Sequence, residues 1–177
     1  MLQDSRISVK RVIMGSVFLA VSVIISIAES VSGLNALIPI PGVKLGLCNV
    51  AITACLYVCS VRIAFFVALL RPLFMFLFWS NPVSLAMSFC GGIMAYISLV
   101  FTKKLYGKVF SFCGISCISA LFHSAGQILA AMLLMGDGAL LGYFPLFAAC
   151  SSVAGTFCGA VMNIVIPRLE KAVGRMC

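Results

Sequence analysis

The chain has 177 residues, of which 63% are hydrophobic and 9% are charged, with a net charge of +8 and a mean hydropathy of +1.23. Soluble domains carry about 25% charged residues, so this composition excludes a soluble globular enzyme and indicates an integral membrane protein of one domain. The positive charge lies in small clusters between apolar runs, which indicates membrane topology rather than a nucleic-acid surface.

Six apolar runs are long enough to cross about 30 Å of hydrocarbon, which takes about 20 residues with 17 near the minimum. These predicted spans are residues 12–31, 45–61, 63–79, 83–102, 109–135 and 139–167. Arg62 alone separates the second from the third, and a glycine-rich turn carrying Asp137 separates the fifth from the sixth. We therefore predict an all-α membrane protein with six transmembrane helices over residues 12–167, flanked by basic segments 1–11 and 168–177.

The basic residues predict the orientation of these spans. Ten of the twelve Lys and Arg residues, all except Lys44 and Arg71, fall on one side of the membrane if six spans are present. The positive-inside rule places that side in the cytoplasm, so both termini are expected to be cytoplasmic. The first span is long for a cleaved signal peptide, and we interpret it as an uncleaved helix.

Small side chains recur along the first span. Ser16 and Ala20 are four residues apart, and Ser22, Ser26 and Ser30 follow at the same spacing. This spacing lets two membrane helices approach closely. Two interpretations stay open, which are packing inside this bundle and a docking face for another membrane subunit.

Between the first two spans the sequence reads ALIPIPGVKLGLCNV, residues 36–50. Pro39, Pro41 and Gly42 do not suit a continuous helix, and irregular backbone at membrane depth is tolerated only inside protein or along a cavity. This segment either dips into the outer mouth of the bundle or forms an ordinary outer loop. Lys44 and Asn49 stand where the second span begins, and the positive end of that helix would attract an anion. Alternatively, Lys44 extends to the outer headgroups.

Three ionisable residues fall within the spans, where burial of charge is costly. Glu29 lies near the outer end of the first span, Arg71 at the centre of the third and His123 at the centre of the fifth. An arginine at mid-membrane costs about 2.5–3.5 kcal/mol, so Arg71 needs a partner or a wet cavity. The partner would be Glu29 or carbonyl groups freed near Pro72, and the cavity would hold a ligand. For Glu29, an interfacial position exposed to water is the alternative.

His123 and Gln127 are four residues apart and share one helix face. They form either a polar seam along a cavity or a satisfied interior pair. That helix carries no second histidine and no carboxylate, so we expect no metal site. The nine cysteines form no C-x-x-C motif and lie mainly in apolar runs, which is typical of small packed side chains rather than of metal or redox chemistry.

Three stretches carry a resemblance to a known family: PIPGVKLGLCNVAI, ALFHSAGQILAA and YFPLFAACSSVAGTFCGAVM. Together they resemble the Gx transporter family of small bacterial membrane proteins, also called heptaprenyl diphosphate synthase component I, over residues 12–168. That family looks related to the substrate-binding S components of energy-coupling factor transporters. S components are six-helix proteins that bind a vitamin or similar small molecule, and a transmembrane T subunit with two ATPases energises them.

The resemblance implies roles for particular residues. In S components the loop between the first two helices gates the site, which makes Pro39, Pro41 and Gly42 the expected gate, with Lys44 and Asn49 at its inner edge. It also implies a T-subunit docking face at Ser16 and Ala20, although S components commonly carry Ala-x-x-x-Ala there and this chain carries Ser-x-x-x-Ala.

The sequence lacks the motifs of a catalytic subunit. Prenyl diphosphate synthases bind Mg²⁺ and diphosphate through clustered aspartates, but no two of the four acids here lie within twenty residues of each other: Asp4, Glu29, Asp137 and Glu170. A P-loop and a recognisable nucleophile motif are also absent. We therefore expect neither enzymatic activity nor a cofactor.

Two functional hypotheses follow, with a purely structural role as a third. The first is a substrate-binding subunit for uptake in the bacterial cytoplasmic membrane, whose ligand contacts are expected from six residues: Glu29, Lys44, Asn49, Arg71, His123 and Gln127. The second is a non-catalytic membrane partner of polyprenyl diphosphate or quinone synthesis that holds a lipid product. The first needs a closed pocket with converging polar groups, and the second needs an apolar groove open to lipid with cations at its mouth.

Overall fold

A computed structural model describes residues 2–32, 44, 46–79, 81–107 and 109–174, and within these residues the chain is helical without β-strands. The helices follow in the order α1 (Leu2–Val31), α2 (Asn49–Val58), α3 (Val61–Trp79), α4 (Pro82–Lys103), α5 (Phe112–Met135), the 3₁₀ helix η2 (Gly138–Tyr143) and α6 (Phe144–Gly174). Five stretches among the described residues are long and apolar enough to cross a membrane: Val9–Val31, Val61–Phe78, Pro82–Lys103, Phe112–Met135 and Gly138–Ala172. The prediction of an all-α, multi-pass membrane protein is confirmed, with five candidate spans where six were expected.

The difference lies in the second predicted span, residues 45–61, which becomes the ten-residue helix α2. Ten residues rise about 15 Å, half of the hydrocarbon thickness. Gly46 has φ +82°, in the left-handed region, so the helix does not extend upstream through it. At the other end Cys59 leaves the helical region, and the Ser60 hydroxyl accepts a hydrogen bond from the Ile63 amide at the start of α3.

α2 is apolar because it is the centre of the bundle. It contacts each of the other five α-helices, and seven of its ten residues are buried. Its Ile52 and Leu56 belong to a core to which every other α-helix contributes a buried side chain: Phe18, Val67, Leu99, Ile115 and Met162. Short apolar helices of about 10–14 residues are usually buried core helices rather than spans.

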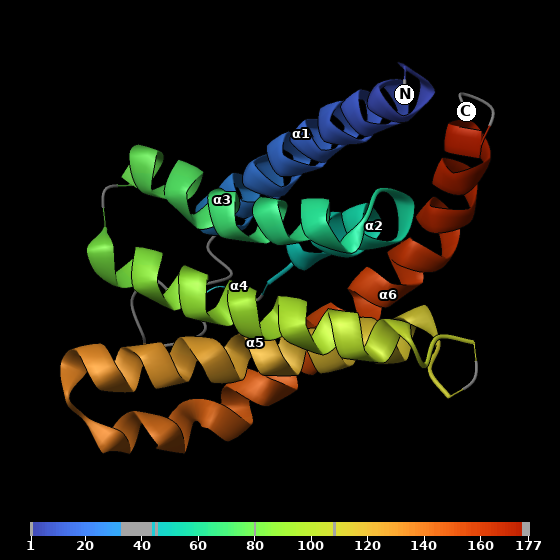
Figure 1. Cartoon of the computed structure of the whole chain (residues 1–177). Helices are drawn as coiled ribbons and strands as arrows, with labels where there is room; N and C mark the ends of the chain where they lie inside the picture. The colour runs from blue at the N-terminus through green and yellow to red at the C-terminus, as the bar shows by residue number, and fades with distance from the viewer. Residues whose placement is uncertain (1, 33–43, 45, 80, 108, 175–177) are drawn as a thin grey trace.

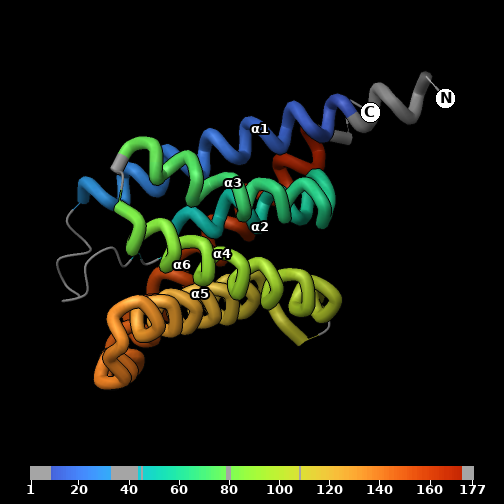
Figure 2. The backbone as a smooth tube through the Cα atoms, turned by 60° about the vertical axis from the view of Figure 1, so that its left-hand side comes forward, coloured from blue at the N-terminus to red at the C-terminus, as the bar shows by residue number. Residues whose placement is uncertain are grey.

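Figures 1 and 2 both show α1 beside α3 on one side of the bundle and α4 beside α5 on the other, with α2 between them. α5 packs closely against α4 and α6 through glycines. A Cβ on Gly126 would stand 2.8 Å from the Cys90 carbonyl oxygen, and one on Gly155 would stand 2.8 Å from the Cys117 Cα. Gly155 and Gly159 form a Gly-x-x-x-Gly pair on α6 that the sequence analysis did not single out.

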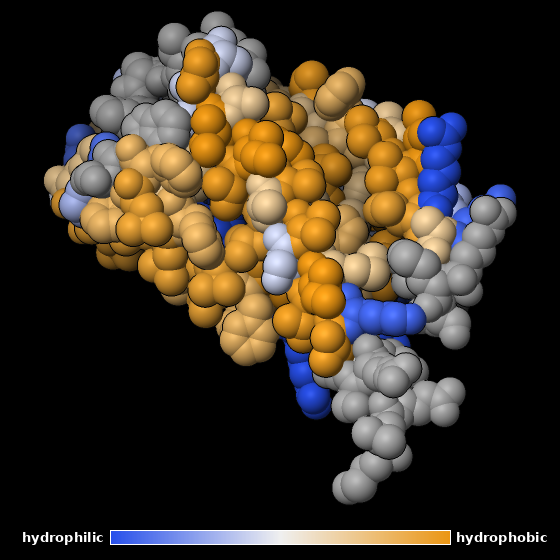
Figure 3. Space-filling model, turned by 90° about the horizontal axis from the view of Figure 1, so that it is seen from above, coloured by the Kyte–Doolittle hydropathy of each residue, from blue (hydrophilic) through white to orange (hydrophobic). Residues whose placement is uncertain are grey.

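The ends of the bundle differ in charge. Both chain ends, the α2–α3 turn and the α4–α5 connection lie at the same end of the molecule in Figure 1. At this basic end the Lys103 Nζ donates a hydrogen bond of 2.7 Å to the Leu56 carbonyl oxygen and lies 5.0 Å from the centre of the Tyr57 ring. Figure 3 shows a largely hydrophobic surface between the ends, as a lipid-facing protein requires. The cytoplasmic orientation of the basic end stays a prediction from the positive-inside rule.

The contact between Lys103 and α2 gives a test of how the short helix is held. The Leu56 carbonyl is in the last turn of α2, where carbonyl groups lack partners within the helix. We expect Lys103→Met to lower the free energy of unfolding by about 1 kcal/mol, the usual net contribution of one hydrogen bond. Thermal unfolding in detergent would measure this, with the exposed neighbour Lys104→Met as the control. Equal losses in the two variants would contradict a specific role for Lys103.

Candidate functional site

The polar residues predicted within the membrane converge in the interior of the bundle. They come from α1, from the segment before α2, and from α2, α3 and α5, and none is more than 6% exposed: Glu29, Lys44, Asn49, Arg71, His123 and Gln127. We call these six residues the interior polar cluster. Glu29 is 2% exposed and Lys44 is 6% exposed. Both side chains are therefore buried, whereas the alternatives had Glu29 exposed to water and Lys44 extended to the outer headgroups.

Backbone amides of the segment before α2 are bound by side chains from two other helices. The Gly46 amide donates a hydrogen bond of 3.1 Å to Glu29 Oε1 on α1, and the Lys44 amide donates one of 3.3 Å to Gln127 Oε1 on α5. Gln127 Nε2 in turn lies 3.0 Å from His123 Nε2. These bonds connect α1 to α5 through the chain that leads into α2.

Arg71 is the most deeply buried charge in the cluster, with 1% of its surface exposed. Its guanidinium contacts the thiol of Cys48, which precedes α2 and is completely buried. Its Nε has no hydrogen-bond partner among the described residues. Among the described residues, the contact seen for Arg71 is thus with this thiol, which is only a weak acceptor.

Asn49, at the first turn of α2, is also buried without satisfying its side chain. Neither its Nδ2 nor its Oδ1 has a hydrogen-bond partner within the described residues. A buried polar group without a partner costs about 1–3 kcal/mol, so native structures contain few of them. Asn49 and Arg71 thus offer one acceptor and several donors to a molecule that enters the cluster.

The formal charges of the cluster favour an anion. Lys44 and Arg71 are cationic, and Glu29 is the one carboxylate among the six. The positive charges of Lys44 and Arg71 both act on the nearby His123 ring. Burial, and then the positive charge of Arg71, lower the pKa of Lys44, while Glu29 acts in the opposite direction. A low local dielectric strengthens these interactions. An added negative group would stabilise both cations.

Two glycines enclose the His123 ring. A Cβ on Gly46 would stand 3.0 Å from His123 Cδ2, and one on Gly91 of α4 would stand 3.0 Å from His123 Cε1 and 2.9 Å from Gln127 Cγ. The sequence pattern did not point to Gly46, Gly91 or Cys48 as site residues. The Gly91–Gly92 pair within an apolar run was an available signal, because small residues mark close approach of membrane helices.

The other predicted functional residues lie elsewhere. Ser16 and Ala20 are on the exposed face of α1, whereas Ser22 and Ser26 face the interior, so the small residues divide between the two faces. Ser16 Oγ donates a hydrogen bond of 3.2 Å to the Val12 carbonyl oxygen. The expected gate residues Pro39, Pro41 and Gly42 lie outside the described residues.

Gly91 allows a test of the site geometry without removing a polar group. A methyl group there would stand 2.8 Å from the His123 carbonyl oxygen, so we expect Gly91→Ala to displace His123 and Gln127 and to lower the free energy of unfolding by about 1–3 kcal/mol. Gly92→Ala is a matched control, because its Cβ would make an ordinary contact of 3.6 Å with the Ala68 carbonyl oxygen. Thermal unfolding of both variants measures the difference, and a Gly91→Ala protein as stable as the control would contradict the geometry.

A model of the protein family described as heptaprenyl diphosphate synthase component I matches residues 18–165. This range covers most of the chain and confirms the family resemblance drawn from the sequence motifs. No curated protein and no solved structure gave a match.

Proposed function

The chain belongs to the heptaprenyl diphosphate synthase component I family, and within that family we propose that it is a membrane-embedded, substrate-binding subunit for the uptake of a small acidic or zwitterionic molecule. The observation that carries the proposal is the state of Arg71, which is buried, has a thiol as its partner and leaves its Nε without one among the described residues.

The donor geometry of Arg71 suits a carboxylate. A guanidinium presents five N–H groups in a planar fork that binds carboxylate or phosphate in a bidentate manner. In this proposal Arg71 and Lys44 hold the acidic group of the substrate, and Asn49, His123 and Gln127 donate and accept its remaining hydrogen bonds. Glu29 pairs with a cation of the cluster or takes an amino group of the substrate.

A non-catalytic role fits the distribution of acids. Asp137 accepts a hydrogen bond from the Ala139 amide at the start of η2, and Glu170 is an exposed residue near the C-terminal end of α6. Among the described residues no three His, Cys, Asp or Glu side chains form a group that could hold a metal ion.

By resemblance to S components, those partners would be a T subunit and two ATPases in the bacterial cytoplasmic membrane. The exposed positions of Ser16 and Ala20 on α1 support a docking face there. By the same resemblance, Pro39, Pro41 and Gly42 would form the gate.

Native mass spectrometry after gentle extraction from the source membranes tests the proposal. We expect the wild-type protein to retain a small polar metabolite. Arg71→Gln should lower the affinity for it at least about ten-fold, since a hydrogen bond to a charged group contributes about 1.5–3 kcal/mol. Ser98→Ala is the control, because that buried hydroxyl donates to the Ala95 carbonyl within α4, outside the cluster. A folded Arg71→Gln protein with unchanged occupancy and uptake would refute the assignment.

A second candidate function is a non-catalytic membrane component of heptaprenyl diphosphate synthesis, as the family description suggests. The observation that favours it is an apolar groove between α1 and α3 that opens at the surface of the bundle.

The same extraction distinguishes this candidate. Organic extracts of the purified protein should contain a polyprenyl species in stoichiometric amount if the second function holds, and its occupancy should not depend on Arg71, since that residue is buried away from the groove lining. A polar metabolite without any polyprenyl species would exclude the second function.

A further inference from the structure

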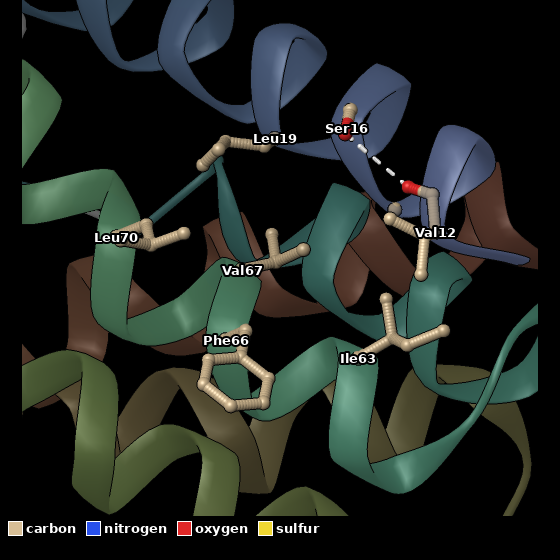
Figure 4. A pocket seen from close by; sticks show the side chains of 8 residues that line it. Val12, Ser16, Leu19, Ile63, Phe66, Val67 and Leu70 are labelled. Carbon is tan, nitrogen blue, oxygen red and sulfur yellow. Dashed lines mark hydrogen bonds between the residues drawn. The ribbon is translucent and has the colours of Figure 1, made fainter. Parts of the chain in front are cut away.

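The groove between α1 and α3 has a volume of about 180 Å³ and is shown in Figure 4. Its eight lining residues are Val12, Gly15, Ser16, Leu19, Ile63, Phe66, Val67 and Leu70. Val12, Phe66 and Leu70 are exposed at its rim, so the groove is accessible from the surrounding lipid. The hydroxyl of Ser16, the one polar side chain in the lining, is bound to the Val12 carbonyl.

The sequence makes this groove through one close contact and the small residues beside it. Gly15 has no side chain, and α3 approaches there until Ile63 fills the place of a Cβ. On each helix the lining residues follow the i, i+3, i+4, i+7 spacing of a single helix face. From Val12 to Leu19 and from Ile63 to Leu70 the groove follows two turns of each helix, about 10 Å.

Two exposed arginines precede the lining residues at one end of the groove. Arg11 is four residues before Gly15 on α1, and Arg62 is four residues before Phe66 on α3, and both are exposed. The two helices run in the same direction, from the basic end of the bundle (Figure 1). Arg11 comes one residue before Val12 and Arg62 one residue before Ile63, so both arginines lie at the N-terminal end of the groove.

We propose that this groove binds one hydrocarbon chain of an anionic membrane phospholipid, with its phosphate between Arg11 and Arg62. The apolar lining offers the chain no unsatisfied hydrogen-bonding group, and arginine forks bind phosphate in a bidentate manner. Basic residues beside a membrane helix attract anionic lipid by about 1 kcal/mol each. This site is separate from the interior polar cluster and does not depend on the proposed substrate.

The test is native mass spectrometry of the full-length, delipidated protein titrated with phosphatidylglycerol or phosphatidylcholine of identical acyl chains. We expect tighter binding of phosphatidylglycerol, and a loss of about 5-fold in that affinity for each of Arg11→Gln and Arg62→Gln. The double variant Lys104→Gln, Lys171→Gln removes as much charge as the two arginine substitutions together, from exposed positions directly after α4 and on α6, and should leave the preference intact.

Two further variants separate the headgroup from the groove and guard against misfolding. Arg11→Lys with Arg62→Lys keeps the charges and should retain a preference for phosphatidylglycerol. Ser16→Leu fills the groove and should weaken the binding of both lipids.

Equal binding of the two lipids by the wild type, or an equal loss in the Lys104 and Lys171 control, would overturn the inference. Displacement of phosphatidylglycerol by equimolar farnesyl diphosphate, dependent on the two arginines, would also overturn it in favour of a single-chain diphosphate. The measurement uses the isolated protein, because Ser16 also belongs to the proposed docking face on α1 and a docked partner would displace the lipid.

Discussion

A guanidinium that is removed from water inside a mostly apolar bundle must be stabilised by its surroundings, and the arrangement around Arg71 follows from that constraint. The cost of an arginine at mid-membrane is several times the thermal energy, and Cys48 is a weak acceptor. The surrounding elements therefore supply polar groups: Glu29 from α1, Asn49 from α2 and the His123–Gln127 pair from α5. Elsewhere the core described by the structure is built largely from aliphatic and aromatic contacts.

The central position of α2 is linked to this constraint. A full-length span in its place would satisfy its own backbone and would need no polar partners in the interior. Because α2 begins only at Asn49, Lys44 and Gly46 lie ahead of its first turn. Their amides reach Glu29 and Gln127 instead. The same helix that completes the hydrophobic core thus brings irregular backbone next to Arg71.

Sequence reasoning predicted the parts of this structure that depend on local pattern. Hydropathy located the five long apolar stretches with bounds that differ by at most five residues from those in the structure, and the cost of buried charge pointed to Glu29, Lys44, Arg71 and His123. Hydropathy also predicted that α2 crosses the membrane, because an apolar run of seventeen residues looks the same whether lipid or protein surrounds it. Only the left-handed Gly46 and the contacts with five other helices distinguish the two cases.

The sequence also could not rank the partners of Arg71. Glu29 was the obvious ion-pair candidate by charge, whereas the contact made in the described residues is with Cys48, which had been assigned to packing. Which side chain meets another across a bundle depends on helix rotation and crossing, and those depend on close contacts such as the one at Gly91. Periodicity gives the face of a helix but not its neighbour.

The irregular segment before α2 has a consequence for how any guest would enter the interior. Two of the six polar side chains, Glu29 and Gln127, already accept hydrogen bonds from the backbone amides of Gly46 and Lys44, as water would in an unfolded chain. A molecule whose donor takes the place of either amide on Glu29 Oε1 or Gln127 Oε1 competes with a backbone donor, so its binding there is an exchange reaction rather than the filling of a vacancy. After such an exchange the released amide lacks a hydrogen-bond acceptor unless the bound molecule provides one. The guest that binds best is therefore one whose own oxygen atoms replace the acceptors it takes away.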